Sequence, residues 1–211
     1  MRVVAGDTKV VPRGQGGGLY LATTGVGVRA AACRLGFSEI RPGDAVLVSG
    51  PVGDHGIAVM LAREQFELSG SIVSDCAPVT QLTAPLAKLA GLRFMRDPTR
   101  GGLATVAHDI ASAAQMCVRL QETQIPVRPG VRAVCKMLGY DPYYLACEGR
   151  VVAVAAPEAA DEVLRLWRRA GAEAARIGRV VPGRASVVLE TEIGGERFLE
   201  ELEDDPLPRI C

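Results

Sequence analysis

The chain has 211 residues, and its 24 Lys and Arg balance its 24 Asp and Glu to a formal net charge of zero. This balance gives no sign of attraction to nucleic acid or to a membrane surface. The longest apolar runs, such as 151–156, have only strand length, which excludes a transmembrane helix, and the N-terminus lacks a secretory signal pattern. A hydrophobic content of 48% with 24 glycines indicates a soluble α/β-type protein rich in tight turns.

Six cysteines are scattered along the chain without a Cys-x-x-Cys pair, which argues against a zinc site or a disulfide framework. A cytoplasmic enzyme is consistent with this usage. Five of the six mostly lie beside apolar residues and are expected to be small buried hydrophobes. These five are Cys33, Cys76, Cys117, Cys135 and Cys147.

The first 42 residues are unusual for the start of a domain. Two predicted strands, at 3–11 and 19–24, are joined by a Gly-rich loop at 12–18. Two such strands are not stable alone. We therefore predict that residues 1–42 are a remnant of another domain, and that the turn Arg41-Pro42-Gly43-Asp44 marks the boundary.

From residue 43 onward, strand and helix patterns alternate, which predicts an α/β fold with a mixed sheet and packed helices over residues 43–195. Asp54 is the expected N-cap of the first helix, and Gly91 the expected end of the second. Residues 196–211 are predicted to be a flexible tail that begins with a short strand. The predicted helices are 57–65, 78–90, one from 103 to about 114, 129–138 and 158–170, and the predicted strands are 45–48, 144–156, 176–181 and 186–190.

The C-terminal tail ends in Pro206-Leu207-Pro208-Arg209-Ile210-Cys211, after an acidic stretch at 200–205. The two prolines favour an extended strut, and the acidic stretch is expected to stay solvated. Cys211 is thus a thiol on a tether, suited to carrying a small group from one site to another. The alternative is an incidental cysteine at a ragged terminus.

Two Gly-rich turns are candidates for binding an anion. The turn at 50–56, which contains His55, joins a strand to a helix and can expose backbone N–H groups. The turn at 97–102 places Arg100 and Gly101 before a helix, which suits a phosphate contact. Either turn is equally explained as an ordinary connection, with His55 packing or capping and Asp97 paired with Arg100.

Two further groups carry chemistry that an enzyme can use. Asp7, Thr8 and Lys9 bring a carboxylate, a hydroxyl and an ammonium together, a set that suits Mg²⁺ and a nucleotide phosphate or simply a polar strand edge. Glu148 follows apolar residues, where burial would raise its pKa and make it a usable base. The alternative for Glu148 is a carboxylate in water at the end of a strand.

Taken together, these segments resemble the C-terminal part of the HypE family, the carbamoyl dehydratases of [NiFe]-hydrogenase maturation. That family belongs to the superfamily of aminoimidazole ribonucleotide synthetase, selenophosphate synthetase and thiamine-monophosphate kinase. The Asp-Pro-Thr-Arg-Gly-Gly turn is shared with superfamily relatives, whereas the terminal Pro-Arg-Ile-Cys is specific to HypE. The resemblance covers nearly the whole chain through the segments 4–11, 23–27, 53–58, 96–104, 147–149 and 208–211.

The resemblance implies a C-terminal domain of the aminoimidazole ribonucleotide synthetase type. It also implies ATP-dependent dehydration of a carbamoyl group on Cys211 to a thiocyanate, which supplies cyanide to the hydrogenase iron. Glu148 would assist proton removal, and Lys9 with Mg²⁺ would offset phosphate charge. Asp7 would contact the metal or the nucleotide.

The same resemblance implies that Thr8 and Gly101 help to bind the nucleotide, and that His55 and Arg100 position the phosphate or the tail. The implied partners are the carbamoyltransferase HypF, which loads Cys211, and the HypC–HypD scaffold, which receives the cyanide. The full-length protein is expected to be a cytoplasmic homodimer.

The chain departs from the family pattern in two respects. The N-terminal portion that supplies much of the ATP and Mg²⁺ site is absent, so Met1 is expected to mark a truncation. Gly17 stands where the family more often has an acidic residue. Two rival functions remain: another ATP-dependent enzyme of the superfamily, or a non-catalytic module that docks maturation partners through its tail.

Overall fold

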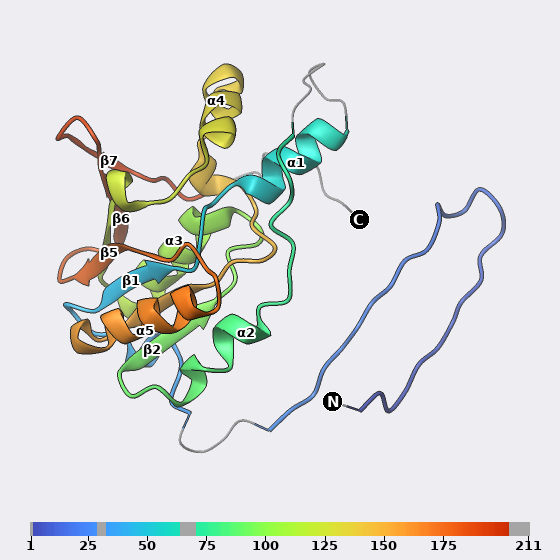
Figure 1. Ribbon diagram of the computed structural model, residues 1–211, viewed down its shortest axis with the longest axis horizontal. Coiled ribbons are helices and arrows are strands. Elements are labelled where there is room, and N and C mark those ends of the chain that lie inside the picture. Colours follow the sequence, from blue (N-terminus) through green and yellow to red (C-terminus); the bar gives the residue numbers. More distant parts are fainter. Residues whose placement is uncertain (1, 29–32, 64–70, 203–211) are drawn as a thin grey trace. The chain divides into compact units, whose positions relative to one another are not determined.

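The computed structural model describes residues 2–28, 33–63 and 71–202 (Figure 1). The chain divides into two compact units, Met1–Ala30 and Ala31–Cys211. In the first unit, residues 2–28 form neither helix nor strand, and all of them are exposed. The strands predicted at 3–11 and 19–24 are therefore wrong, because this segment has no apolar face to pack against.

The second unit is built on a seven-stranded mixed sheet in the order β2-β4-β1-β5-β3-β6-β7. All neighbouring pairs are antiparallel except β3 and β6, which run parallel. The predicted fold class is confirmed. The strands are β1 (Ala45–Val48), β2 (Leu92–Arg96), β3 (Cys117–Gln121), β4 (Val152–Ala155), β5 (Ala175–Val181), β6 (Ser186–Glu190) and β7 (Glu196–Phe198), and the α-helices are α1 (Asp54–Ala62), α2 (Thr80–Thr83), α3 (Gly102–Ala114), α4 (Pro129–Leu138) and α5 (Pro157–Arg169).

The central strands are covered on both faces, as their continuous apolar sequences require. Val46 and Val48 of β1 pack in a core with α3, while Ala45 and Leu47 pack in a second core with α5. Trp167 anchors α5, since it is 1% exposed and its indole N–H donates to the carbonyl of Leu82 at 3.0 Å. The alternating side chains of β1 thus place one helix on each face.

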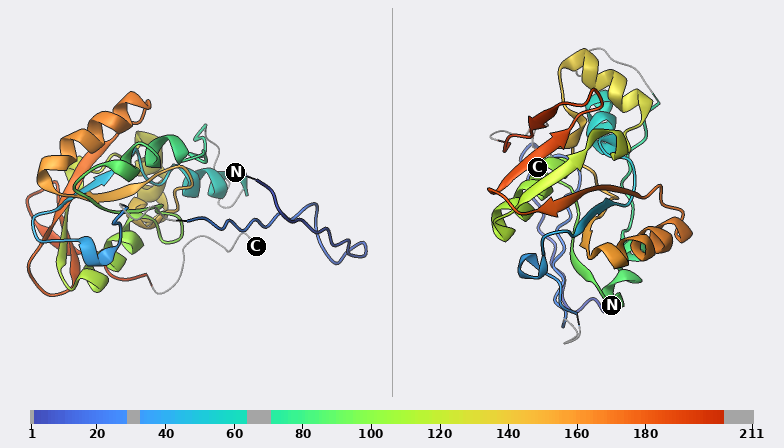
Figure 2. Two further views of the ribbon diagram at one scale, coloured as in Figure 1. Left: turned by 90° about the horizontal axis from the view of Figure 1, so that it is seen from below. Right: turned by 90° about the vertical axis from the view of Figure 1, so that its left-hand side faces the viewer.

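A third apolar cluster joins α1 to α4 at one end of the sheet (Figure 2). Pro129 opens α4 at a position where a missing N–H costs nothing, and Gly139 ends it in the left-handed conformation at φ 73°. The helix predicted at 129–138 is therefore confirmed. Ile57 of α1 and Val131 of α4 are fully buried in this cluster, which holds the turn after β1 in place.

Several predicted elements differ in extent. The helix predicted at 78–90 is broken into α2 and the 3-10 turn η3 (Leu86–Lys88), because Pro85 lies between them and lacks an N–H. Of the strand predicted at 144–156, only β4 forms, and residues 142–144 make the 3-10 turn η5 (Pro142–Tyr144). The strands β2 and β3 were not predicted. Asp54 is the first residue of α1 rather than its N-cap, which is Gly53.

The second unit extends beyond residues 43–195 at both ends. Phe37, in the 3-10 turn η1 (Phe37–Glu39), stacks on Phe94 of β2 with 4.6 Å between ring centroids. The N–H of Gly36 donates to the carbonyl of Arg93 at 2.9 Å. At the other end β7 joins the sheet, and Leu199 is 1% exposed in the α3 core. Among the described residues, no helix is long and apolar enough to cross a membrane.

Candidate functional site

Three turns that lie far apart in the sequence meet at one edge of the sheet. Since β1 and β2 are both antiparallel to β4, the carboxyl ends of β1 and β2 lie beside the start of β4. The turns 50–56, 97–102 and 145–150 adjoin these three strand ends. Two backbone contacts join them: the N–H of Cys147 donates to the carbonyl of Pro98 at 2.9 Å, and that of Gly56 to Ala146 at 3.2 Å.

Glycine is required where these turns approach each other most closely. Gly102 has φ 59°, and a Cβ built there would lie 2.5 Å from the carbonyl oxygen of Leu145. At Gly149, a Cβ would lie 1.8 Å from the carbonyl oxygen of Asp75. These contacts explain why the turns are Gly-rich: the backbone of one packs directly on the backbone of the next.

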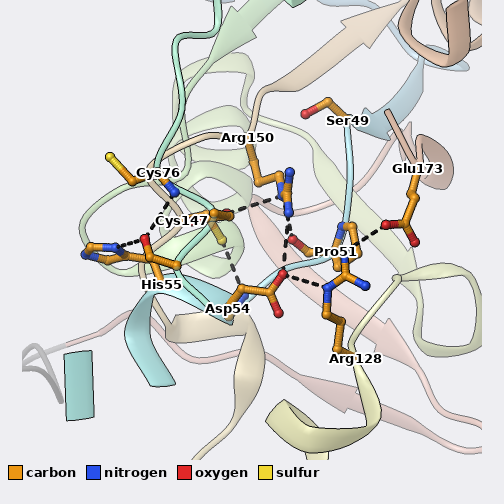
Figure 3. Close-up of polar contacts among 12 residues, drawn as sticks. Ser49, Pro51, Asp54, His55, Cys76, Arg128, Cys147, Arg150 and Glu173 are labelled. Atoms are coloured by element: carbon orange, nitrogen blue, oxygen red, sulfur yellow. Dashed lines mark hydrogen bonds and ion pairs between the residues drawn. The ribbon is translucent and has the colours of Figure 1, made fainter. Parts of the chain in front are cut away.

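A buried network of charges lies under the turn 50–56 (Figure 3). The Asp54 carboxylate, 3% exposed, faces the Arg128 Nε at 3.1 Å and the Arg150 Nη2 at 3.4 Å. Arg150 also donates to the carbonyl of Pro51 at 2.9 Å. Arg128 continues to Glu173 at 2.8 Å, and its pKa is raised by hydrogen bonds first to Asp54 and then to Glu173. Each buried charge thus has an opposite charge beside it.

Cys147 belongs to the packing of this edge. The N–H of Gly53 donates to its Sγ at 3.4 Å, and its own thiol points to the carbonyl of Leu145 at 3.6 Å. Burial raises the pKa of Cys147 from 9.0 to about 12, so the thiol is neutral. The prediction of buried cysteines is confirmed for Cys147, Cys117 and Cys135, but it is wrong for Cys33, which is half-buried, and for Cys76, which is exposed.

Glu148 stands at the surface of the same edge. The side chain is exposed, so the expectation of a buried carboxylate is wrong. The reason is local. Burial alternates along this segment, so Cys147 and Gly149 are buried and Glu148 between them faces the solvent. Its backbone N–H donates to the Asp75 Oδ1 at 3.0 Å, which fixes the main chain under an accessible carboxylate.

His55 is half-buried at the start of α1, and its Nδ1 lies 2.9 Å from the Ser74 Oγ. Arg100 is exposed, whereas Gly101 is buried with φ 67° immediately before α3. The turns that carry His55, Arg100, Gly101 and Glu148 are therefore brought together, as the sequence patterns required of a shared site.

Sequence reasoning missed Ser74, Asp75 and Arg150. Ser74 and Asp75 lie in an irregular stretch with no periodicity and no Gly-rich motif. The Asp75 side chain is fully buried, 3.2 Å from the Arg150 Nε. Burial raises the pKa of Asp75, while the N–H of Glu148 and the charge of Arg150 oppose that rise. In the sequence, Asp75 and Arg150 are one acid and one arginine 75 positions apart. No motif links them, so the signal of their pairing in the sequence is weak.

The C-terminal segment leaves the domain at this edge. After β7, His108 Nε2 lies 2.7 Å from the carbonyl oxygen of Leu199, and the Tyr144 hydroxyl donates to that of Glu200 at 2.8 Å. A Cβ built at Gly101 would lie 3.5 Å from the Leu202 Cδ2. Residues 199–202, the tail root, thus run between α3 and the turn that leads to Glu148.

The remaining predicted residues belong to the first unit or to the C-terminal end of the chain. Asp7, Thr8 and Lys9 are exposed in the first unit, where the Asp7 Oδ1 accepts the N–H of Thr8 at 2.8 Å. Cys211 lies outside the described residues. Within the described part of the chain, no three His, Cys, Asp or Glu side chains gather as metal ligands would.

Comparison with known proteins gives a consistent set of relatives. Residues 41–190 match the family model "AIR synthase related protein, C-terminal domain". The chain is 46% identical to the carbamoyl dehydratase HypE of Cupriavidus necator over 213 residues, which covers 99% of this chain and 61% of that protein. The chain therefore spans about three fifths of the length of the curated relatives it matches.

Solved structures of HypE are similar in fold. The crystal structure of E. coli HypE has a TM-score of 0.79 at 40% identity, over 84% of this chain and 56% of that one. HypE in complex with ATP gives 0.76 at 38% identity, over 82% and 54%. A HypE–HypF complex gives 0.74 at 35% identity, over 80% and 56%.

Proposed function

Because the chain belongs to the AIR synthase related proteins, whose C-terminal domain it contains, we propose that it takes part in carbamoyl dehydration for hydrogenase maturation. Its similarity to HypE over almost all of its length supports this reaction. The substrate is an S-carbamoyl group on Cys211, and the product is a thiocyanate that supplies cyanide ligands for the iron of [NiFe]-hydrogenase.

The reaction needs phosphoryl chemistry because a carbonyl oxygen is a very poor leaving group. ATP phosphorylates the oxygen of Cys211–S–C(=O)–NH₂, and the nitrogen then loses both of its protons. The C–O bond breaks as the C≡N bond forms, giving Cys211–S–C≡N, phosphate and ADP. The protein must place a base at the nitrogen and positive charge at the phosphate.

Glu148 is our candidate for the base. Its exposed carboxylate can reach a tail delivered from solvent, and its backbone is fixed by Asp75. His55 and Arg100 lie on turns of the same edge and suit contacts to phosphate or tail. Gly101 adopts the left-handed conformation, which allows the tight turn of the chain directly before α3.

We assign to the first unit the residues that bind the negatively charged phosphates of the nucleotide. Asp7, Thr8 and Lys9 offer a carboxylate, a hydroxyl and an ammonium, all exposed, and this donor set fits Mg²⁺ bound together with phosphates. Bound Mg²⁺ would offset the charge that develops on the phosphates. We assign Asp7 to the metal or nucleotide and Lys9 to the phosphate.

The observation that carries the proposal is the position of the tail root. The Tyr144 hydroxyl holds the carbonyl of Glu200 beside the turn that leads to Glu148, and the Leu202 side chain lies next to Gly101. Cys211 follows Leu202 by nine positions in the sequence, and such a segment spans at most about 30 Å. A carrier thiol on this segment therefore starts from the edge where the candidate base lies.

The partners follow from the same chemistry. HypF is the proposed source of the carbamoyl group, supported by the solved HypE–HypF complex. The HypC–HypD scaffold is the proposed acceptor of cyanide, and a homodimer is proposed for the longer protein. The five described cysteines are free thiols, consistent with a reaction in the cytoplasm.

Intact-protein mass spectrometry tests the proposal. The chain is incubated with HypF, carbamoyl phosphate and ATP, and the modified protein is then isolated and given fresh Mg-ATP. We expect Cys211 to gain the mass of one carbamoyl group in the first step and to lose one water in the second. The Cys211→Ala variant should show neither change.

The rival functions give different results. A docking module would accept the carbamoyl group, or only bind HypF, without losing water. Another ATP-dependent enzyme of the superfamily would hydrolyse ATP while Cys211 stays unmodified. If Cys211 gains no mass, the carrier role of its thiol is wrong.

A further inference from the structure

The dipeptide Ser74-Asp75 touches two candidate residues of the second unit, His55 and Glu148. We propose that Ser74 and Asp75 are positioning residues that fix the ring of His55 and the main chain of Glu148. Neither touches the reacting atoms, since each acts through its neighbour. The roles of His55 and Glu148 rest on the proposed function, whereas the positioning is argued from contacts alone.

Ser74 determines which nitrogen of His55 carries the proton. The Ser74 Oγ accepts the N–H of Cys76 at 3.1 Å and lies 2.9 Å from the His55 Nδ1. One lone pair of the Oγ is thus occupied by that N–H, and in our proposal the hydroxyl donates its proton to Nδ1, which accepts it. His55 is then held as the Nε2–H tautomer, with an N–H donor available to an oxyanion or a phosphate oxygen.

Asp75 holds the main chain that bears Glu148. Its Oδ1 accepts the N–H of Glu148 at 3.0 Å, its Oδ2 lies 3.2 Å from the Arg150 Nε, and its carbonyl packs on Gly149. Three consecutive residues are thus joined to one buried acid. The Glu148 carboxylate stays exposed, but the backbone that aims it does not move freely.

Arg150 links the two halves of this arrangement. Its guanidinium reaches the carbonyl of Pro51 and the carboxylate of Asp54, both in the turn that carries His55 (Figure 3). The same guanidinium faces Asp75. The positions of His55 and Glu148 are therefore coupled through one buried ion cluster rather than set separately.

The tautomer is measured by NMR of the imidazole nitrogens in the chain itself. The chain has two histidines, and His108 serves as the internal reference because its partner is the carbonyl of Leu199. We expect neutral His55 to be the Nε2–H tautomer in the wild type and a mixture of tautomers in Ser74→Ala, with His108 unchanged. An Nδ1–H tautomer in the wild type, or no change in Ser74→Ala, would contradict the role of Ser74.

The backbone contact is measured by hydrogen exchange at the Glu148 amide. We expect Asp75→Ala to exchange about tenfold faster there, the equivalent of one lost hydrogen bond. Asp75→Asn keeps an acceptor oxygen, so its exchange should lie closer to the wild type. Equal exchange in all three proteins would overturn the role of Asp75, and Asp75→Asn decides if Asp75→Ala fails to fold.

The same variants are then followed during loss of water from carbamoylated Cys211. We expect Ser74→Ala and Asp75→Ala to slow this step by about 10- to 100-fold, as misplaced groups do, with an unchanged KM for ATP. Asp75→Asn, which keeps the acceptor oxygen, should lie closer to the wild type. Ser112→Ala, an exposed serine on α3, is the matched control. A purely structural role would instead lower the melting temperature, and unchanged rates in folded variants would contradict the proposal.

These results separate the inference from the proposed function. If wild-type protein never loses water, the proposed function fails, while NMR and hydrogen exchange still decide whether Ser74 and Asp75 hold their neighbours. If the wild type loses water and the variants do so equally fast, only the positioning role fails.

Discussion

Thiols near the candidate site differ in reactivity because of their surroundings. Cys147 is buried between two turns, and burial raises its pKa from 9.0 to about 12. Cys135 is a buried residue of α4, and burial raises its pKa to about 11. Cys76 is exposed and has no such protection. Because the thiolate is the reactive form, these three residues should react at very different rates.

We predict that iodoacetamide modifies Cys76 of the folded chain at pH 8, whereas Cys147 and Cys135 react only when the chain unfolds. A thiol with a pKa raised by folding stabilises the fold fully below pH 9 and loses that contribution as the pH rises toward 12. Peptide mapping after timed alkylation checks the order. Modification of Cys147 as fast as Cys76 would contradict the buried position.

Glycine at 102 is predicted to be essential for folding. Gly102→Ala adds a Cβ 2.5 Å from the Leu145 oxygen at φ 59°, and we expect a loss of about 4 kcal/mol or more of unfolding free energy. Gly139→Ala is the matched control, since its φ is 73° but nothing lies within 4 Å of the added Cβ. This control should lose only about 1–2 kcal/mol, and urea unfolding compares the two. Equal losses would mean that the close approach of the turns is unimportant.

The sequence singled out the Gly-rich turns and Glu148 as candidates, but it did not show which residues they contact in the fold. A turn signal is local, whereas the bond between Asp75 and Glu148 joins positions 73 apart in the sequence. Burial of Glu148 was predicted from apolar neighbours in sequence, yet strand-like alternation points it outward. Local pattern thus identified the turns that meet at this end of the sheet and missed the residues that hold them together.

At the scale of elements, the strongly patterned helices were predicted closely. The apolar face of 103–114 became α3, and the helices predicted at 129–138 and 158–170 became α4 and α5. Predictions were wrong where one residue interrupts a pattern, as at Pro85. They were also wrong where a strand forms only because it pairs with strands that are distant in the sequence. The strand β3 was missed because it forms between β5 and β6, and such non-local pairing leaves little local signal.

The tail root is the segment that connects the domain to Cys211, the proposed carrier thiol. We predict that Tyr144→Phe frees residues 200–202, because the hydroxyl no longer donates to the carbonyl of Glu200. Cleavage by a Glu-specific protease at Glu200 and Glu201 should become about fivefold faster, the equivalent of about 1 kcal/mol. Tyr140→Phe is the control, because the Tyr140 hydroxyl makes no hydrogen bond within the described residues. If both variants are cleaved at the wild-type rate, the contact does not hold the tail.

At the scale of the whole molecule, the chain combines an exposed first unit with a folded second unit. The second unit was predicted in class and topology type, because its apolar patterns form a two-faced core. The first unit carries Asp7, Thr8 and Lys9 without a helix or strand among residues 2–28. The chain spans about three fifths of the length of its curated relatives. A test of the proposed reaction therefore also measures how much of the site this part of the protein retains.

The most direct test of the account is the rate of water loss from carbamoylated Cys211 in Glu148→Gln. Glutamine keeps the size of the side chain but cannot accept a proton as a base. We predict a slowing of about 100-fold or more, the range for loss of a general base. Glu201→Gln, which changes an exposed glutamate of the tail root, should match the wild type. If Glu148→Gln loses water as fast as wild-type protein, Glu148 is not the base and the central claim is wrong.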